Sequence, residues 1–235
     1  MLKLMKLEYN KHHLSQYFKG VALWTVVIFA LVALMGWGSR NQIEPMFPSY
    51  ADFMSLTNIF IRIVFISFSA VILSRLVIDE YKNKTIHLLF TYPLQRKKLM
   101  QAKLAIVFIF CFASIVFSTF IINLLIYFIS PHLYLFENSV EMNEIISTVP
   151  STFITALMMG GVSLIPLFFG MRKKSTAATI TWSVIIGFLI NATVSTGGGE
   201  TVGLSQFIVI PSILCVFGLL IGYLAYRKVD KIDIL

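Results

Sequence analysis

Six long runs of apolar residues constrain this chain more than any other feature of its sequence. A helix needs about 20 apolar residues to cross the hydrocarbon core of a bilayer. The runs are apolar on all sides, which is typical of helices buried in lipid and in one another. Transmembrane β-strands would instead show alternation over about 10 residues. The sequence therefore predicts an all-α integral membrane protein with a single transmembrane domain over residues 1–235 and six transmembrane helices, at residues 18–37, 56–78, 104–129, 150–169, 177–194 and 207–226.

The composition excludes most soluble classes of protein. Hydrophobic residues make up 57% of the chain and charged residues 13%, against about 25% charged in an ordinary globular domain. So few charges cannot cover the surface of a water-soluble domain. The net charge of +8 would suggest a nucleic-acid partner in a soluble protein. In a membrane protein it indicates basic cytoplasmic loops instead, so we expect no nucleic-acid partner.

The basic residues predict the orientation of the chain in the membrane. In the six-span arrangement, 17 of the 19 lysines and arginines lie on one side, and only Arg40 and Arg62 fall elsewhere. Lysine and arginine are enriched in cytoplasmic loops. We therefore expect a multi-pass protein of the cell (plasma) membrane with both termini in the cytoplasm.

The first 17 residues form a short amphipathic stretch. Leu4, Leu7, Leu14 and Phe18 fall near one helical face, and lysines lie on the others. This pattern favours an interfacial helix over residues 1–17, with its apolar side in the acyl chains and its lysines near anionic headgroups. The alternative is a basic flank that only sets the topology.

No sequence motif of a catalytic site is present. The chain has no phosphate-binding GxxxxGK[ST] loop, no HExxH and no GxSxG. Cys111 and Cys215 lie inside apolar runs without metal-ligand spacing, so we interpret both as packing residues. We expect a protein that is not an enzyme and that binds no metal or cofactor of its own.

The connection between the second and third spans carries an apolar patch that spanning the membrane does not require. Ile86, Leu89 and Phe90 predict one apolar face of a short helix, which Pro93 ends. An exposed apolar patch beneath a membrane bundle needs a partner surface. The alternative is that this face lies against the membrane.

At this connection the sequence resembles a known family. An acidic residue leaves the second span, a basic-Thr-apolar helix follows, and Pro-x-x-Arg and a lysine lead into the third span. This pattern is similar to the permease subunits of the type-2 ABC exporter family. The resemblance implies a coupling helix between the second and third spans that docks in a separate cytosolic ATPase, which would bind the ATP and Mg²⁺. The resemblance implies that Glu80 lies at the gate, that the coupling helix carries Thr85, Leu88 and Leu89, and that the return carries Pro93, Arg96 and Lys103. With Ile86 and Phe90 of the apolar face, these residues up to Arg96 are the candidates for coupling to the ATPase.

Polar residues and glycines inside the spans are further candidates. Arg62, Ser67 and Asn123 could line a substrate path or bond across helices. For Arg62 we expect snorkelling to the external headgroups; the alternatives are pairing with Glu137 or Glu200, or with substrate. The Gly218-x-x-x-Gly222 spacing predicts close helix packing in the sixth span.

Taken together, these patterns predict a permease that works as a dimer with two cytosolic ATPases and exports a hydrophobic or amphipathic compound. The second permease is another copy or a related chain. The small size and basic start resemble bacitracin- and lantibiotic-type immunity permeases of Gram-positive bacteria, which implies a bacterial protein of antimicrobial peptide resistance and a peptide or lipid-like antibiotic as substrate. Two alternatives are a membrane-integral enzyme acting on lipids and a passive immunity or scaffold protein.

Overall fold

The computed structural model of the chain describes residues 2–11, 15–39, 47, 49–82, 96–133, 142–195 and 204–228. All regular elements in these ranges are helical, which agrees with the predicted all-α membrane class. They are α1 (Leu2–Lys11), α2 (Ser15–Ser39), α3 (Tyr50–Leu73), the π-helical η1 (Ser74–Ile78), α4 (Asp79–Lys82), α6 (Arg96–Leu133), α7 (Met142–Val162), α8 (Pro166–Lys173), α9 (Thr176–Ser195) and α10 (Leu204–Lys228).

Several of these helices could cross a bilayer. Four stretches in the described part of the chain are long and apolar enough, namely Ser15–Ser39, Tyr50–Ile78, Lys98–Ile129 and Ile145–Lys173. Two further apolar stretches, Thr176–Asn191 and Val209–Ala225, are shorter. The count of six spans therefore stays a prediction.

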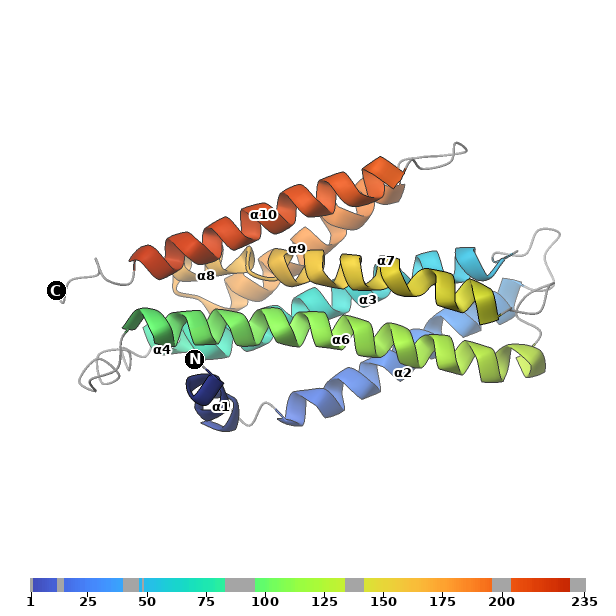
Figure 1. Cartoon of the computed structure of the whole chain (residues 1–235), viewed down its shortest axis with the longest axis horizontal. Helices are drawn as coiled ribbons and strands as arrows, with labels where there is room; N and C mark the ends of the chain where they lie inside the picture. Colours follow the sequence, from blue (N-terminus) through green and yellow to red (C-terminus); the bar gives the residue numbers. More distant parts are fainter. Residues whose placement is uncertain are drawn as a thin grey trace.

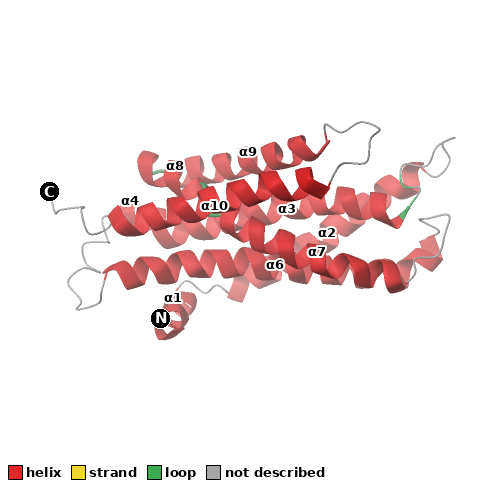
Figure 2. Cartoon of the chain, turned by 45° about the horizontal axis from the view of Figure 1, so that its top comes forward, coloured by secondary structure: helices red, strands yellow, loops and turns green. Residues whose placement is uncertain are grey.

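Helix α3 lies at the centre of the bundle. Its core side chains Phe53, Phe65 and Ile66 are fully buried. Figure 2 shows α9 and α6 on opposite sides of α3, and both pack against it. In Figure 1, α1, α4 and the last turns of α8 and α10 lie at the same end of the bundle. Below we call this the basal end.

The second helical stretch begins earlier than the sequence predicts. It starts at Tyr50 rather than at residue 56, because Ser49 caps it: the Ser49 hydroxyl accepts a hydrogen bond from the Asp52 main-chain N–H. Arg62 consequently lies about 18 Å along the helix instead of about 9 Å. The interfacial helix also differs from its predicted range of 1–17, because α1 ends at Lys11 and α2 starts at Ser15.

The fourth span is broken near its middle. Helix α7 ends at Val162, the residues 163–165 form a turn, and α8 begins with Pro166. Proline has no N–H and is tolerated in the first turn of a helix. The turn is held by short-range bonds such as Leu164 N–H to the Gly161 carbonyl, 3.1 Å. The chain can therefore bend here without an unsatisfied donor at residue 166.

Helices α7 and α10 approach most closely at glycines. A side chain at Gly218 would collide with the Gly161 carbonyl oxygen, so the two backbones are in direct contact there. Gly222, one turn further along, has only the ends of Leu164 and Leu104 near it, at 3.4 and 3.7 Å from the position of a Cβ. The two glycines of the predicted pair thus have different surroundings.

This difference predicts different effects of the same substitution. Gly218→Ala should lower the free energy of unfolding by about 1–3 kcal/mol, because the backbones must separate. Gly222→Ala should leave it nearly unchanged, since ordinary van der Waals space is available. Thermal unfolding in detergent micelles would measure both. Equal stability of the two variants would contradict the close contact at Gly218.

Candidate functional site

Four charged side chains meet at the basal end, and we call them the basal charge cluster: Glu8 and Lys11 of α1, Glu80 of α4 and Lys103 of α6. Lys103 forms an ion pair with Glu80, and its Nζ lies 3.7 Å from Oε2 of Glu8. The Nζ of Lys11 donates to Oε1 of Glu80 at 3.1 Å. Two carboxylates and two ammonium groups thus join three helices that are distant in sequence.

The centre of this cluster is deeply buried. Lys103 is 2% exposed, Glu8 5% and Glu80 9%, whereas the side chain of Lys11 is 49% exposed. Moving a charge out of water costs several kcal/mol unless partners compensate it. The cluster therefore holds its members in one arrangement, and removing Lys103 takes from Glu8 and Glu80 the buried ammonium group that lies close to both.

A π-helical turn sets the position of Glu80. In η1 the main-chain N–H of Asp79 bonds to the Ser74 carbonyl, five residues back. One extra residue in a helical turn rotates the following residues about the helix axis. Such π-helical turns are frequent at functional sites. Lys103 also donates to the Leu76 carbonyl inside this turn, at 2.8 Å. Lys103 therefore holds both the π turn and the carboxylate that follows it.

The cluster lies at both ends of the connection in which the sequence predicts a coupling helix. Glu80 lies in α4, three residues before the segment 83–95, and Lys103 is in the second turn of the helix that follows this segment. The predicted coupling residues Thr85, Ile86, Leu88, Leu89, Phe90 and Pro93 lie outside the described residues. Arg96 is the first residue of α6, and its side chain is likewise not described. Of the predicted coupling residues, the structure places Glu80 in a defined site.

Sequence reasoning missed Glu8 and Lys11. It treated the first residues as an amphipathic basic helix and gave no role to the acidic one. Glu8 is the only acidic residue before Glu44, and a single acid on a basic interfacial helix was the available signal. The partner of each could not be identified from the sequence, because Lys103 lies 95 residues from Glu8 and Glu80 lies 69 residues from Lys11.

The predicted intramembrane polar residues have three different environments. The Tyr50 hydroxyl donates to Oδ1 of Asn123 at 2.8 Å, which joins α3 to α6. Ser67 donates to the Ile63 carbonyl of its own helix. Arg62 is 8% exposed, and its Nε is buried without a hydrogen-bond partner among the described residues. Its expected snorkelling to the headgroups is wrong for this arrangement, since the side chain is enclosed by protein. Glu137 and Glu200, its alternative partners, lie outside the described residues.

No set of metal ligands was found where the structure describes the chain. No three histidine, cysteine, aspartate or glutamate side chains in those ranges are grouped to hold a metal ion. Cys111 and Cys215 are buried free thiols. The site is therefore one of ion pairs and helix contacts.

Comparison with known proteins gives the family. Residues 4–191 match the model of the ABC-2 family transporter proteins. The chain belongs to the ABC-2 transporter family. It is also 34% identical over 232 residues to the uncharacterized protein YcbO of Bacillus subtilis (strain 168). The aligned region covers 99% of this chain and 100% of the relative. No solved structure matches.

Family membership confirms the resemblance to ABC-2 permeases seen in the sequence. An ABC-2 permease is a multi-pass membrane protein, in agreement with the long apolar helices. The family also implies ABC ATPase subunits as partners. The basal charge cluster of this permease lies at the end of the bundle that carries most of its described basic residues.

The ion pairs of the cluster predict a large effect of one substitution. Lys103→Met should lower the free energy of unfolding by about 3 kcal/mol, because Glu8 and Glu80 both lose the buried ammonium group that lies between them. Lys98→Met, at an exposed position of the same helix, should change it by less than about 0.5 kcal/mol. Unfolding in mixed micelles measures both.

A double variant isolates the pair itself. Adding Glu80→Gln to Lys103→Met should recover roughly 1 kcal/mol, since one of the two buried carboxylates next to Lys103 is no longer charged. If Lys103→Met were as stable as Lys98→Met, the cluster would not hold the three helices together.

Proposed function

We propose that this ABC-2 permease forms six spans with both termini in the cytoplasm and works as a dimer with two cytosolic ATPases. The permease dimer exports hydrophobic or amphipathic compounds, with an antimicrobial peptide or a lipid-like antibiotic as the substrate. Residues 83–95 carry the coupling helix that docks on the ATPase. The dimer consists of two copies of this chain or of this chain and a related one.

The basal charge cluster is the observation that carries this proposal. It connects α1, the π turn at the end of the second span, and the start of the third. A force applied to residues 83–95 by a closing ATPase reaches both helices directly, because Glu80 and Lys103 are bonded to each other. Rigid elements with two alternative arrangements are how such movements travel through a protein.

The polar groups inside the bundle support a hydrophobic or amphipathic substrate. Most described hydroxyls there bond to carbonyls of their own helix, as Thr57 does to Phe53 and Ser69 to Phe65. The pair Thr25 and Ser118 bonds across α2 and α6 at 2.7 Å. Few described polar groups inside the bundle are left to bind a hydrophilic solute. Outside the basal charge cluster, Arg62 is the buried charged side chain among the described residues.

Copurification tests the proposal. The tagged chain, coexpressed with its neighbouring genes, should bring down an ABC ATPase, and the reconstituted complex should show vanadate-sensitive transport. Leu89→Asp should weaken ATPase binding about thirtyfold, the ~2 kcal/mol typical of an interface anchor. Asn83→Asp adds the same charge outside the apolar patch and should bind normally.

The outcomes separate the proposal from the alternatives. A chain that binds no ATPase contradicts it. Binding without vanadate-sensitive transport would favour a passive immunity protein, and lipid turnover by the purified chain would favour an enzyme.

Arg62 gives a test of the substrate path. Arg62→Met should leave the free energy of unfolding unchanged or raised, because it removes a buried charge that has no described counterion. It should nevertheless reduce protection of cells against bacitracin or a lantibiotic about tenfold, if this guanidinium contacts the substrate; such a loss corresponds to ~1.4 kcal/mol of binding. Growth inhibition assays measure protection.

Arg172→Met, at an exposed position near the end of α8, is the control for loss of one positive charge. Arg62→Lys should retain part of the protection. A destabilised Arg62→Met with unchanged protection would show that Arg62 has a structural role instead.

A further inference from the structure

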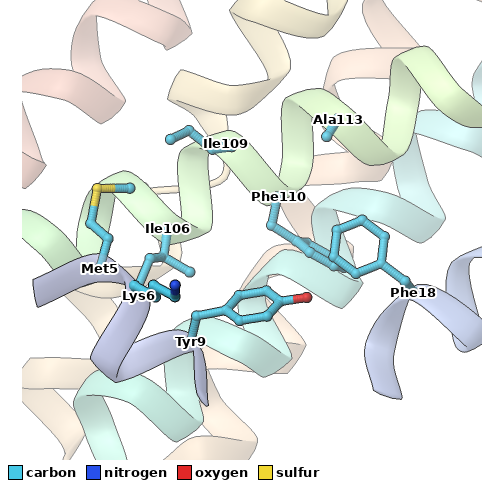
Figure 3. Close-up of a pocket in the computed structure, with 8 residues that line it drawn as sticks. All are labelled: Met5, Lys6, Tyr9, Phe18, Ile106, Ile109, Phe110 and Ala113. Atoms are coloured by element: carbon cyan, nitrogen blue, oxygen red, sulfur yellow. The ribbon is translucent and has the colours of Figure 1, made fainter. Parts of the chain in front are cut away.

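A groove of about 260 Å³ lies between α1, α6 and the start of α2 (Figure 3). It is separate from the basal charge cluster, although α1 contributes to both. The rings of Phe18 and Phe110 meet edge to face with their centroids 5.5 Å apart. Figure 3 shows Met5 and Lys6 at the other end of the groove. Its lining consists of Met5, Lys6, Tyr9, Phe18, Ile106, Ile109, Phe110 and Ala113.

The residues that line the groove are almost all apolar. Its surface is apolar, and Lys6 is the one charged residue among those that form it. Lys6 is exposed, so its positive charge lies at the rim of an apolar groove. This combination fits a molecule with an apolar chain and an anionic end.

The groove opens toward the membrane rather than toward the bundle interior. Ile109 is 51% exposed and Phe18 41%, and both belong to helices that are long and apolar enough to span the bilayer. Leu7 of α1, the helix that forms one wall of the groove, is 66% exposed. In a multi-pass membrane protein, lipid chains surround such a surface.

We propose that this groove binds one acyl chain of an anionic phospholipid from the leaflet at the basal end, with Lys6 contacting the headgroup phosphate. The lipid fills the space between α1 and α6 and holds the short helix against the bundle. Because α1 also carries Glu8 and Lys11, the lipid stabilises the arrangement in which the basal charge cluster is complete. The site does not depend on what the permease transports.

Photo-crosslinking tests the site in the unmodified chain. The protein is reconstituted in vesicles of equal parts phosphatidylglycerol and phosphatidylethanolamine, with a diazirine on the acyl chain of one lipid at a time. Crosslinks from phosphatidylglycerol should map to α1 and to residues 106–113 of α6. Crosslinks spread evenly over all lipid-facing helices would overturn the proposal.

Native mass spectrometry with variants tests the two halves of the site. Ala113→Phe should abolish the retained phosphatidylglycerol by filling the groove, whereas Ala30→Phe, on an exposed face of α2, should retain it. Lys6→Gln should lower the preference for phosphatidylglycerol over phosphatidylethanolamine about fivefold. Lys19→Gln, at another exposed position of the chain, should not.

Two results would contradict the proposal. One is retention of phosphatidylglycerol by Ala113→Phe equal to that of the unmodified chain. The other is displacement of the lipid crosslinks by bacitracin at α1 and α6, which would make the groove a binding site for transported compound. If Ala113→Phe fails to fold, the crosslinking map still decides.

Discussion

A backbone inside hydrocarbon has no water to bond with, and this constraint shapes the whole chain. Helices satisfy it because each N–H finds a carbonyl within the same segment. Side-chain hydroxyls follow the same rule here, since Thr25, Thr57 and Ser69 each donate to a carbonyl of their own helix. The places where the helical pattern changes, the π turn at Ser74–Ile78 and the turn at residues 163–165, keep local hydrogen bonds. Residues 163–165 and most of residues 74–78 are buried in protein as well.

Charge in this protein is concentrated where the bundle meets its predicted partner. At the basal end, Lys103, Glu80 and Glu8 compensate one another in a buried cluster. Near the middle of α3, Arg62 has no such compensation from the described residues. The first arrangement is suited to holding helices together during movement. Burying the Arg62 charge without a described counterion costs free energy of folding. This cost is the reason to test Arg62 as a substrate contact.

Parts of the site were predictable and parts were not. Glu80 was singled out from its place at the end of the second span, and the family resemblance gave its role. Glu8 was missed because its partner Lys103 is remote in sequence, and no periodicity links them. The Gly218-x-x-x-Gly222 spacing predicted close helix packing, yet a side chain is excluded at Gly218 by the Gly161 backbone and not at Gly222. Which backbone faces a glycine depends on how two helices cross.

By itself the sequence determined the class of protein, the membrane environment and the family, because these follow from apolar length, charge and a local motif. The tertiary structure decided which charges meet, where α3 begins relative to Arg62, and that α1 packs against α6 over an apolar groove. The physical reason is the distance along the chain over which each interaction acts. Apolar runs and caps act over a few residues of the chain, whereas ion pairs, helix crossings and grooves form between segments that only folding brings together.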